Sequence, residues 1–263
     1  MNYDIQKLHI VQQEILDYFV EICKKNNFDY FLLGGTALGA YRHKGFIPWD
    51  DDLDVGMPRD DYEKFISIFK NENGKFYLQN EHTESNWFLT FSKIRKKDTV
   101  FIEGYAEDIF EMNGIYIDVF PIDYLDKNRK SFLYQRYLKH CLRFNSCKNL
   151  YKRRGKIKYI FEHIICFPVF CIGTQKTLAK LNNLCIGKCK RENANFLVVY
   201  DDSVIQGLDY DMFYPPINLT FEGKEYCCPN RITDYLVALY GDSFMELPPE
   251  DERATHEAIR VEF

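Results

Sequence analysis

The spacing of apolar positions predicts alternating helices and strands over the first 125 residues. In residues 3–26 apolar side chains recur at helical spacing, which predicts an amphipathic helix. The short apolar run 28–33 predicts a strand that leads into a pair of glycines, and residues 36–42 suit a short helix. Further strands are predicted at 75–79, 87–94 and 114–121. We therefore expect one α/β core in residues 1–125.

Two acidic residues alternate with apolar ones shortly after the glycine pair. Side chains two residues apart in a strand point to the same face, so Asp52 and Asp54 would present their carboxylates together. Leu53 and Val55 would then face the core. Mg²⁺ binds one or two protein carboxylates together with substrate phosphates, which makes this pair a candidate metal site. The alternative is a solvated turn, the usual role of acidic runs.

A third acidic residue stands inside another apolar alternation. Ile115, Ile117 and Val119 would face the core, and Asp118 would point to the opposite face of the strand. A buried charge needs a partner. A metal ion shared with the first two acids would supply one, and a salt bridge to a neighbouring arginine is the alternative. Asp123 lies outside this alternation, and we expect it in a loop.

The glycine pair and the residues after it favour phosphate binding. Gly34 and Gly35 permit a tight turn whose N–H groups can approach an anion, and the helix expected from Thr36 would direct its positive end there. The basic residues that follow, Arg42 and His43, could contact the substrate phosphates. A solvated basic turn is the alternative.

A second pair of basic residues ends the strand predicted at 87–94. Lys93 and Arg95 are two residues apart, so both would point to one face and could bind one anion. The alternative is an edge strand that carries lysine for solubility.

Composition narrows the class of partner and the compartment. A net charge of −5 argues against a nucleic-acid partner held by bulk electrostatics. The first residues are charged and lack the apolar core of a signal peptide, so we expect a cytoplasmic protein with reduced thiols. Nine cysteines are present, but neither Cys185 with Cys189 nor Cys227 with Cys228 has paired C-x-x-C spacing. We therefore expect no structural zinc.

The remainder of the chain divides into two further segments. Residues 126–220 are expected to form a helical insertion that selects the acceptor, and 221–263 a hairpin and helix that pack back on the core. Within the insertion, the apolar run 160–172 follows a basic cluster and is too short to span a bilayer. We expect a buried helix there, and peripheral contact with the inner face of a membrane is the alternative.

One long run carries a resemblance to a known family. The turn Gly34-Gly35-Thr36, the run GAYRHKGFIPWDDD at 39–52 and the pair Asp52-Leu53-Asp54 resemble the signature of the LicD family, within the nucleotidyltransferase superfamily. Residues 234–256 resemble the family's C-terminal pattern, with Arg253 and His256 able to close over the site. The resemblance implies a nucleotidyltransferase-like mixed sheet flanked by helices, with Asp118 as the superfamily's third acid.

The resemblance also implies an activity. Family members transfer a phosphoalcohol, typically phosphocholine from CDP-choline, to a hydroxyl of a cell-surface glycan or of a teichoic acid or lipopolysaccharide precursor. The implied ligands of Mg²⁺ (or Mn²⁺) are Asp52, Asp54 and Asp118, with Asp118 also helping to remove the acceptor proton. The implied substrate-binding residues are Gly34, Gly35, Thr36, Arg42, His43, Lys93 and Arg95. The alternatives are a nucleotidyltransferase that moves NMP from an NTP and a non-catalytic nucleotide- or glycan-binding protein.

Overall fold

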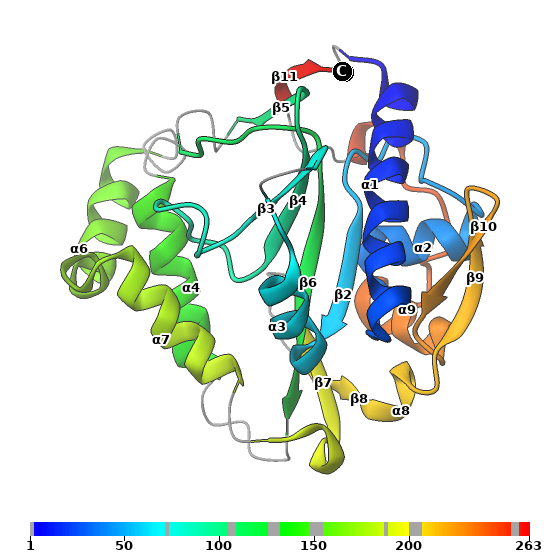
Figure 1. The fold of residues 1–263 in the computed structure, drawn as a ribbon. Helices are drawn as coiled ribbons and strands as arrows, with labels where there is room; N and C mark the ends of the chain where they lie inside the picture. Colours follow the sequence, from blue (N-terminus) through cyan, green and yellow to red (C-terminus); the bar gives the residue numbers. More distant parts are fainter. Residues whose placement is uncertain are drawn as a thin grey trace.

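The main sheet is built around one long central strand. The computed structural model describes residues 3–71, 74–104, 109–125, 132–147, 155–186, 189–199, 207–253 and 258–263. Strand β6 (Tyr116–Leu125) pairs with β2, β4 and β7 of a seven-stranded mixed sheet, in which β1 extends from β2, β3 from β4 and β8 from β7 (Figure 1). The other strands are β1 (Phe31–Leu32), β2 (Asp54–Pro58), β3 (Phe76–Gln79), β4 (Ser92–Lys96), β7 (Phe196–Val199) and β8 (Leu208–Asp209).

The register of this sheet aligns three of the expected site residues. Strand β2 runs parallel to β6 with Asp54 opposite Asp118, and β4 runs antiparallel to β6 with Lys93 opposite Asp118. Side chains at paired positions point to the same face of a sheet. The sheet therefore places two acids and one base in a single row.

Helices and a hairpin surround the sheet. Helix α1 (Ile5–Asn26) packs against β4 and β6 through a fully buried stripe that includes Leu8, Ile15 and Phe19, as its helical spacing predicts. The other elements of the main body are α2 (Gly34–Arg42), α3 (Arg59–Ile68), β5 (Val100–Glu103), η1 (Arg191–Asn193), α8 (Tyr210–Phe213), β9 (Ile217–Phe221), β10 (Lys224–Cys228), α9 (Ile232–Tyr240), η2 (Glu250–Glu252) and β11 (Ala258–Glu262).

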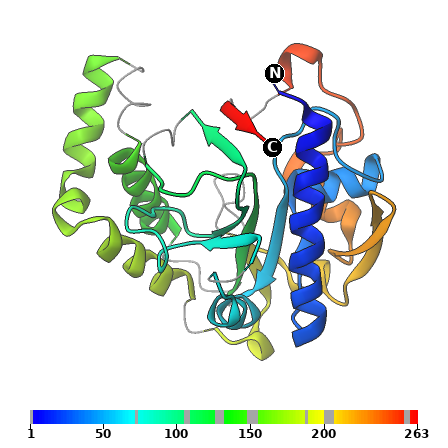
Figure 2. The ribbon, with the colours of Figure 1, turned by 45° about the horizontal axis from the view of Figure 1, so that its top comes forward.

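A separate helical unit lies between β6 and β7 in the sequence. It consists of α4 (Phe132–Ser146), α6 (Lys156–Ile172) and α7 (Thr174–Ile186), which pack on one another and share a second apolar cluster with Trp87, Phe88 and Phe110. Figures 1 and 2 place this unit on the left of the sheet, and α2, α9 and the β9–β10 hairpin on the right. Strands β7 and β8, from the second half of the range 126–220, belong to the main sheet.

The mixed α/β architecture is as expected, and several local predictions are corrected. Helix α2 starts at Gly34 and includes both glycines, so the expected separate turn is absent from this described segment. Strand β4 starts at Ser92, because the aromatic residues before it pack into the helical unit. Asp123 lies on β6, where its fully buried carboxylate accepts two hydrogen bonds, at 2.6 and 2.7 Å, from the Arg59 guanidinium. The expectation of a loop acid was wrong.

Candidate active site

A cleft with a volume of about 680 Å³ lies where α2, β2 and α9 meet. Asp52 and Asp54 both line it, as their alternation with buried Leu53 and Val55 predicted. Asp50 lines it as well. The cleft therefore carries three carboxylates close together in the sequence, a strongly negative surface suited to a cation.

The backbone of Asp54 is fixed from two sides. Its N–H donates to Thr36 Oγ1 at 2.8 Å, and its carbonyl accepts from the N–H of Leu33 at 3.0 Å. Thr36 is buried and is not among the residues that line the cleft. In this structure Thr36 therefore contacts the backbone of Asp54 and does not line the cleft.

The two glycines leave room for the carboxylates. Gly34 has φ of +49°, which favours glycine, and a Cβ there would lie 3.1 Å from Asp54 Oδ2. A Cβ at Gly35 would lie 2.7 Å from Asp50 Oδ2. The N-terminus of α2 thus faces the acids, where its dipole stabilises negative charge.

Asp118 sits in a buried row of charges beside this cleft. Lys93 Nζ lies 2.9 Å from Asp118 Oδ1, 3.6 Å from Glu103 Oε2 and 3.3 Å from the centre of the Tyr116 ring. The Lys93, Glu103 and Asp118 side chains are 1%, 3% and 11% exposed. Burial raises the pKa of Asp118 to about 6, with Lys93 opposing the shift and Glu103 adding to it. The salt-bridge alternative is present here, with a lysine in place of the expected arginine.

The residue types at this site fit a hard divalent cation. Mg²⁺ commonly takes one or two protein carboxylates, and Asp52 and Asp54 offer two from one cleft. Among the described residues, the three carboxylates of Asp52, Asp54 and Asp118 do not gather within 4.8 Å of one another, and Asp118 is paired with Lys93. The first two acids therefore form the core of a candidate metal site, and the ligand role of Asp118 stays a prediction.

The predicted basic residues take different positions. Arg42 lines the cleft, and its Nη1 donates to the carbonyls of Phe244 at 2.7 Å and Glu246 at 3.1 Å, which holds the C-terminal segment over the site. His43 lies beside Trp49 and is not among the lining residues. Burial and the neighbouring Arg42 lower its pKa.

Arg95 lies away from the cleft. Its side chain is 1% exposed, donates to Gln79 Oε1, and reaches the carbonyl of Gly114 at 2.7 Å. These contacts join β3, β4 and the start of β6. Lys93 and Arg95 lie on one face of the strand, as predicted. Of these two residues, Lys93 contacts Asp118, whereas Arg95 contacts Gln79 and Gly114.

Several cleft residues were not predicted from the pattern. The hydroxyl of Tyr235 accepts from the N–H of Gly34 at 2.9 Å, and Tyr240 also lines the cleft, where burial and three nearby aspartates raise its pKa. Both tyrosines come from α9, within the run 234–256 that resembles the family's C-terminal pattern, and neither was predicted to be a site residue. The Arg253 guanidinium lies 4.2 Å from the centre of the Trp49 ring, so the C-terminal segment does approach the cleft. His256 lies outside the described residues.

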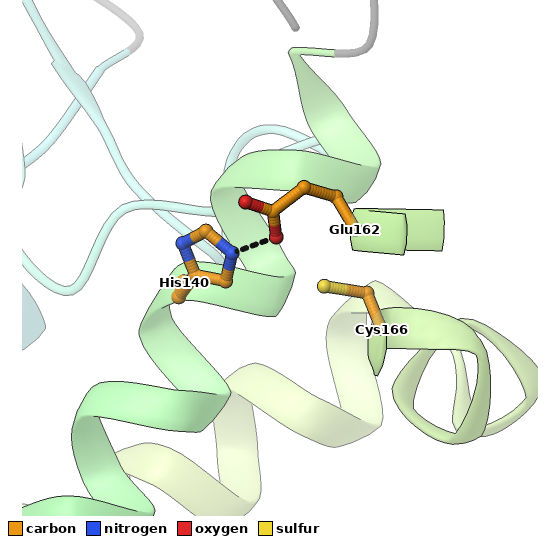
Figure 3. Close-up of side chains that lie close together, drawn as sticks. All are labelled: His140, Glu162 and Cys166. Atoms are coloured by element: carbon orange, nitrogen blue, oxygen red, sulfur yellow. Dashed lines mark hydrogen bonds and ion pairs between the residues drawn. The ribbon is translucent and has the colours of Figure 1, made fainter. Parts of the chain in front are cut away.

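A second group of metal-binding residue types lies in the helical unit. Ligand atoms of His140 on α4 and of Glu162 and Cys166 on α6 fall within 4.8 Å of one another (Figure 3). His140 Nε2 is hydrogen-bonded to Glu162 Oε2 at 2.7 Å. This hydrogen bond pairs the two side chains and links α6 to α4, so we assign the three-residue cluster a role in helix packing.

Comparison with known proteins supports the family resemblance. Residues 27–158 match the family model described as "LicD/FKTN/FKRP, nucleotidyltransferase domain". The lipopolysaccharide cholinephosphotransferase LicD of Haemophilus influenzae is 30% identical over 277 aligned residues, which cover 96% of this chain and 95% of that protein. This chain belongs to the LicD family. The matched domain contains all the predicted metal-binding and substrate-binding residues, whereas Arg253, His256 and the tyrosines of α9 lie beyond it.

Other proteins match parts of the chain. The human ribitol 5-phosphate transferase FKRP is 26% identical over 114 residues, which cover 41% of this chain and 20% of that protein. An uncharacterized protein of Rickettsia prowazekii is 54% identical over 115 residues, which cover 36% of this chain and 40% of that protein. The near end-to-end match to the Haemophilus transferase thus includes the insertion and the C-terminal segment.

Proposed function

We propose that this protein transfers phosphocholine from CDP-choline to a hydroxyl of a cell-surface glycan, or of a lipopolysaccharide or teichoic acid precursor, in a metal-dependent reaction. The observation that carries the proposal is a cleft lined by Asp52 and Asp54, with Asp118 aligned beside Asp54, in a chain that matches a cholinephosphotransferase over 96% of its length. A catalytically inactive binding protein would not need this acidic arrangement.

The aromatic lining of the cleft supports an alcohol with a quaternary ammonium group. Such a cation is attracted to the faces of aromatic rings. The aromatic residues that line the cleft are Trp49, Phe120, Tyr235, Tyr240 and Phe244. Choline could therefore be held among rings while the acids lie at the diphosphate.

In the proposed reaction, the acceptor oxygen bonds to the phosphorus that carries choline. The bond from that phosphorus to the bridging oxygen breaks, and CMP leaves with the electron pair. Bound Mg²⁺ or Mn²⁺, held by Asp52, Asp54 and Asp118, would supply positive charge that stabilises the departing CMP. The acceptor proton passes to a base, and Asp118 is the candidate for that role. Arg42 and the start of α2 would position the donor phosphates.

The first test is CMP release from CDP-choline with a panel of glycan acceptors, with and without EDTA. Acceptor-dependent release that EDTA abolishes and Mg²⁺ restores is the expected result. CDP-ribitol belongs in the same assay, because the similarity to FKRP makes a polyol the second candidate alcohol. Release of pyrophosphate from CTP would instead indicate NMP transfer, and no product from any donor would contradict the enzyme assignment.

The variant that tests the acids is Asp54→Asn. Removal of a residue that only hydrogen-bonds to a metal ligand already lowers metal affinity or activity about 10- to 100-fold, so we expect loss of this acid to lower kcat by at least about 100-fold. The donor KM should change far less. The matched control is Asp60→Asn, because Asp60 is an exposed acid just beyond β2, at the start of α3, and should keep full turnover. Near-normal turnover of the Asp54 variant would contradict the assignment.

A further inference from the structure

Helix α6 exposes an unusual amount of apolar surface. Its buried residues in the structure are Cys166 and Val169, which pack on the neighbouring helices. Eight large apolar side chains are between 43% and 84% exposed: Ile157, Ile160, Phe161, Ile164, Ile165, Phe167, Phe170 and Ile172. The prediction of a buried helix in this segment is therefore wrong. An exposed apolar patch of this extent on a monomer marks an interaction surface.

The position of α6 suits a docking role. In both views the helix lies at the outer edge of the helical unit, on the side of the sheet away from α2 and α9 (Figures 1 and 2). It is held from beneath, by the His140–Glu162 bond and by the Tyr137 hydroxyl, which donates to the carbonyl of Ile165 at 2.9 Å. The outer face is thus supported by a packed unit.

The charges around this apolar face are basic. Lys156 and Lys158 are exposed in the first turn of α6, and the sequence just before the helix contains Lys152, Arg153 and Arg154. The single acid of the helix, Glu162, is paired with His140. An apolar face with a basic flank is complementary to a bilayer whose headgroups are anionic.

The geometry favours a helix that lies on the bilayer. Among the described residues, no single helix has the length and apolar character needed to cross a membrane. Helices α6 and α7 pass such a test as a pair, but they are bent by 90° and α7 buries Leu178, Leu181 and Cys185 inside the unit. We therefore infer that α6 docks this protein on an anionic membrane surface, with its apolar side chains in the acyl boundary and its basic end at the headgroups. This inference does not depend on the proposed activity.

The test is co-sedimentation of the full chain with vesicles of phosphatidylcholine and phosphatidylglycerol, and with vesicles of phosphatidylcholine alone. We expect binding to the anionic vesicles and at least about tenfold weaker binding to the neutral ones, because clustered basic residues add strongly to surface attraction. The double variant Phe161→Ser/Ile164→Ser should bind anionic vesicles at least about tenfold more weakly, because both side chains are about two-thirds exposed and would enter the acyl boundary.

The matched control replaces equally exposed apolar residues elsewhere. Ile10→Ser/Ile259→Ser changes side chains that are 69% and 52% exposed outside the helical unit, and it should bind vesicles like the unaltered protein. Thermal melts of both variants establish that they are folded. Failure of the unaltered protein to bind anionic vesicles, or equal binding by the α6 variant, would overturn the inference. A dimer that only the α6 variant disrupts, with no vesicle binding, would identify a second copy of the chain as the occupant.

Discussion

At the scale of single residues, the glycines of α2 decide whether the cleft can keep its carboxylates. Gly34→Ala would place a Cβ 3.1 Å from Asp54 Oδ2 at a backbone angle of φ +49°. We expect a loss of about 1 kcal/mol in the free energy of unfolding from the backbone strain and a clear loss of kcat from the displaced acid. Thermal melts and CMP release would measure the two effects.

The chain offers a control with the same strain and no crowding. Gly223, between β9 and β10, has φ of +75° and nothing within 4 Å of an added Cβ. Gly223→Ala should therefore lose a similar free energy of unfolding and keep its turnover. Equal turnover of the Gly34 and Gly223 variants would show that the approach of Gly34 to Asp54 has no role in the reaction.

His9 connects stability to pH. Its ring is stacked on Phe46 at 4.0 Å and hydrogen-bonded through Nε2 to the carbonyl of Asp50 at 2.7 Å. Burial lowers its pKa below the usual 6.5, although Asp50, Asp51 and Glu222 oppose the shift. The unfolded chain therefore takes up the proton first, and stability is lost as the pH falls through about 6.5.

The measurement is thermal stability at pH 7.5 and at pH 5.5. We expect the unaltered protein to lose more stability between these values than His9→Gln, which keeps a donor for the carbonyl and cannot gain a charge. His82→Gln, on an exposed loop, is the control and should behave like the unaltered protein. An identical pH dependence of the His9 variant would contradict this account.

At the scale of elements, one buried ion pair fastens α3 to β6. Arg59 contacts Asp123 through two hydrogen bonds of 2.6 and 2.7 Å, and both side chains are less than a tenth exposed. Arg59→Met would leave a buried carboxylate without its partner, and breaking such a pair costs about 3–5 kcal/mol. Urea denaturation should show this loss, and Arg59→Met/Asp123→Leu should recover most of it. Arg231→Met, which breaks an exposed pair with Asp234, should cost less than about 1 kcal/mol.

The elements also show which patterns can be interpreted without a structure. The helical spacing of apolar residues was sufficient to predict α1, because the buried side chains of that helix form a single stripe that packs on one core. Alternation was sufficient to predict that Asp54 and Asp118 point to the face of the sheet opposite their buried neighbours, and Asp52, which precedes β2, lines the cleft together with Asp54. The pattern of apolar residues does not predict which neighbouring element, if any, covers an apolar segment. The aromatic residues before β4 and the apolar run of α6 look like core segments, and only tertiary packing distinguishes a core, a second cluster and an exposed face.

At the scale of the whole molecule, the site is completed by contacts distant in the sequence. Tyr235 reaches Gly34 across 201 positions, and Arg42 reaches the carbonyl of Phe244 across 202. No local pattern contains such a contact, which is why the sequence did not predict the tyrosines of α9 as cleft residues. The partner of Asp118 was likewise not predicted, because it lies on β4 and not on its own strand.

The separation between α6 and the cleft has a consequence for the acceptor. The helical unit and α9 lie on opposite sides of the sheet (Figure 1), and a folded chain of 263 residues has a radius of gyration of about 18 Å. If α6 rests on lipid, α9 and the cleft that it lines are on the side of the sheet away from the bilayer. A lipid-linked acceptor would have to extend from the bilayer past the sheet to reach this cleft. If the proposed glycan transfer is correct, acceptors too short to extend that far from the lipid would be left unmodified.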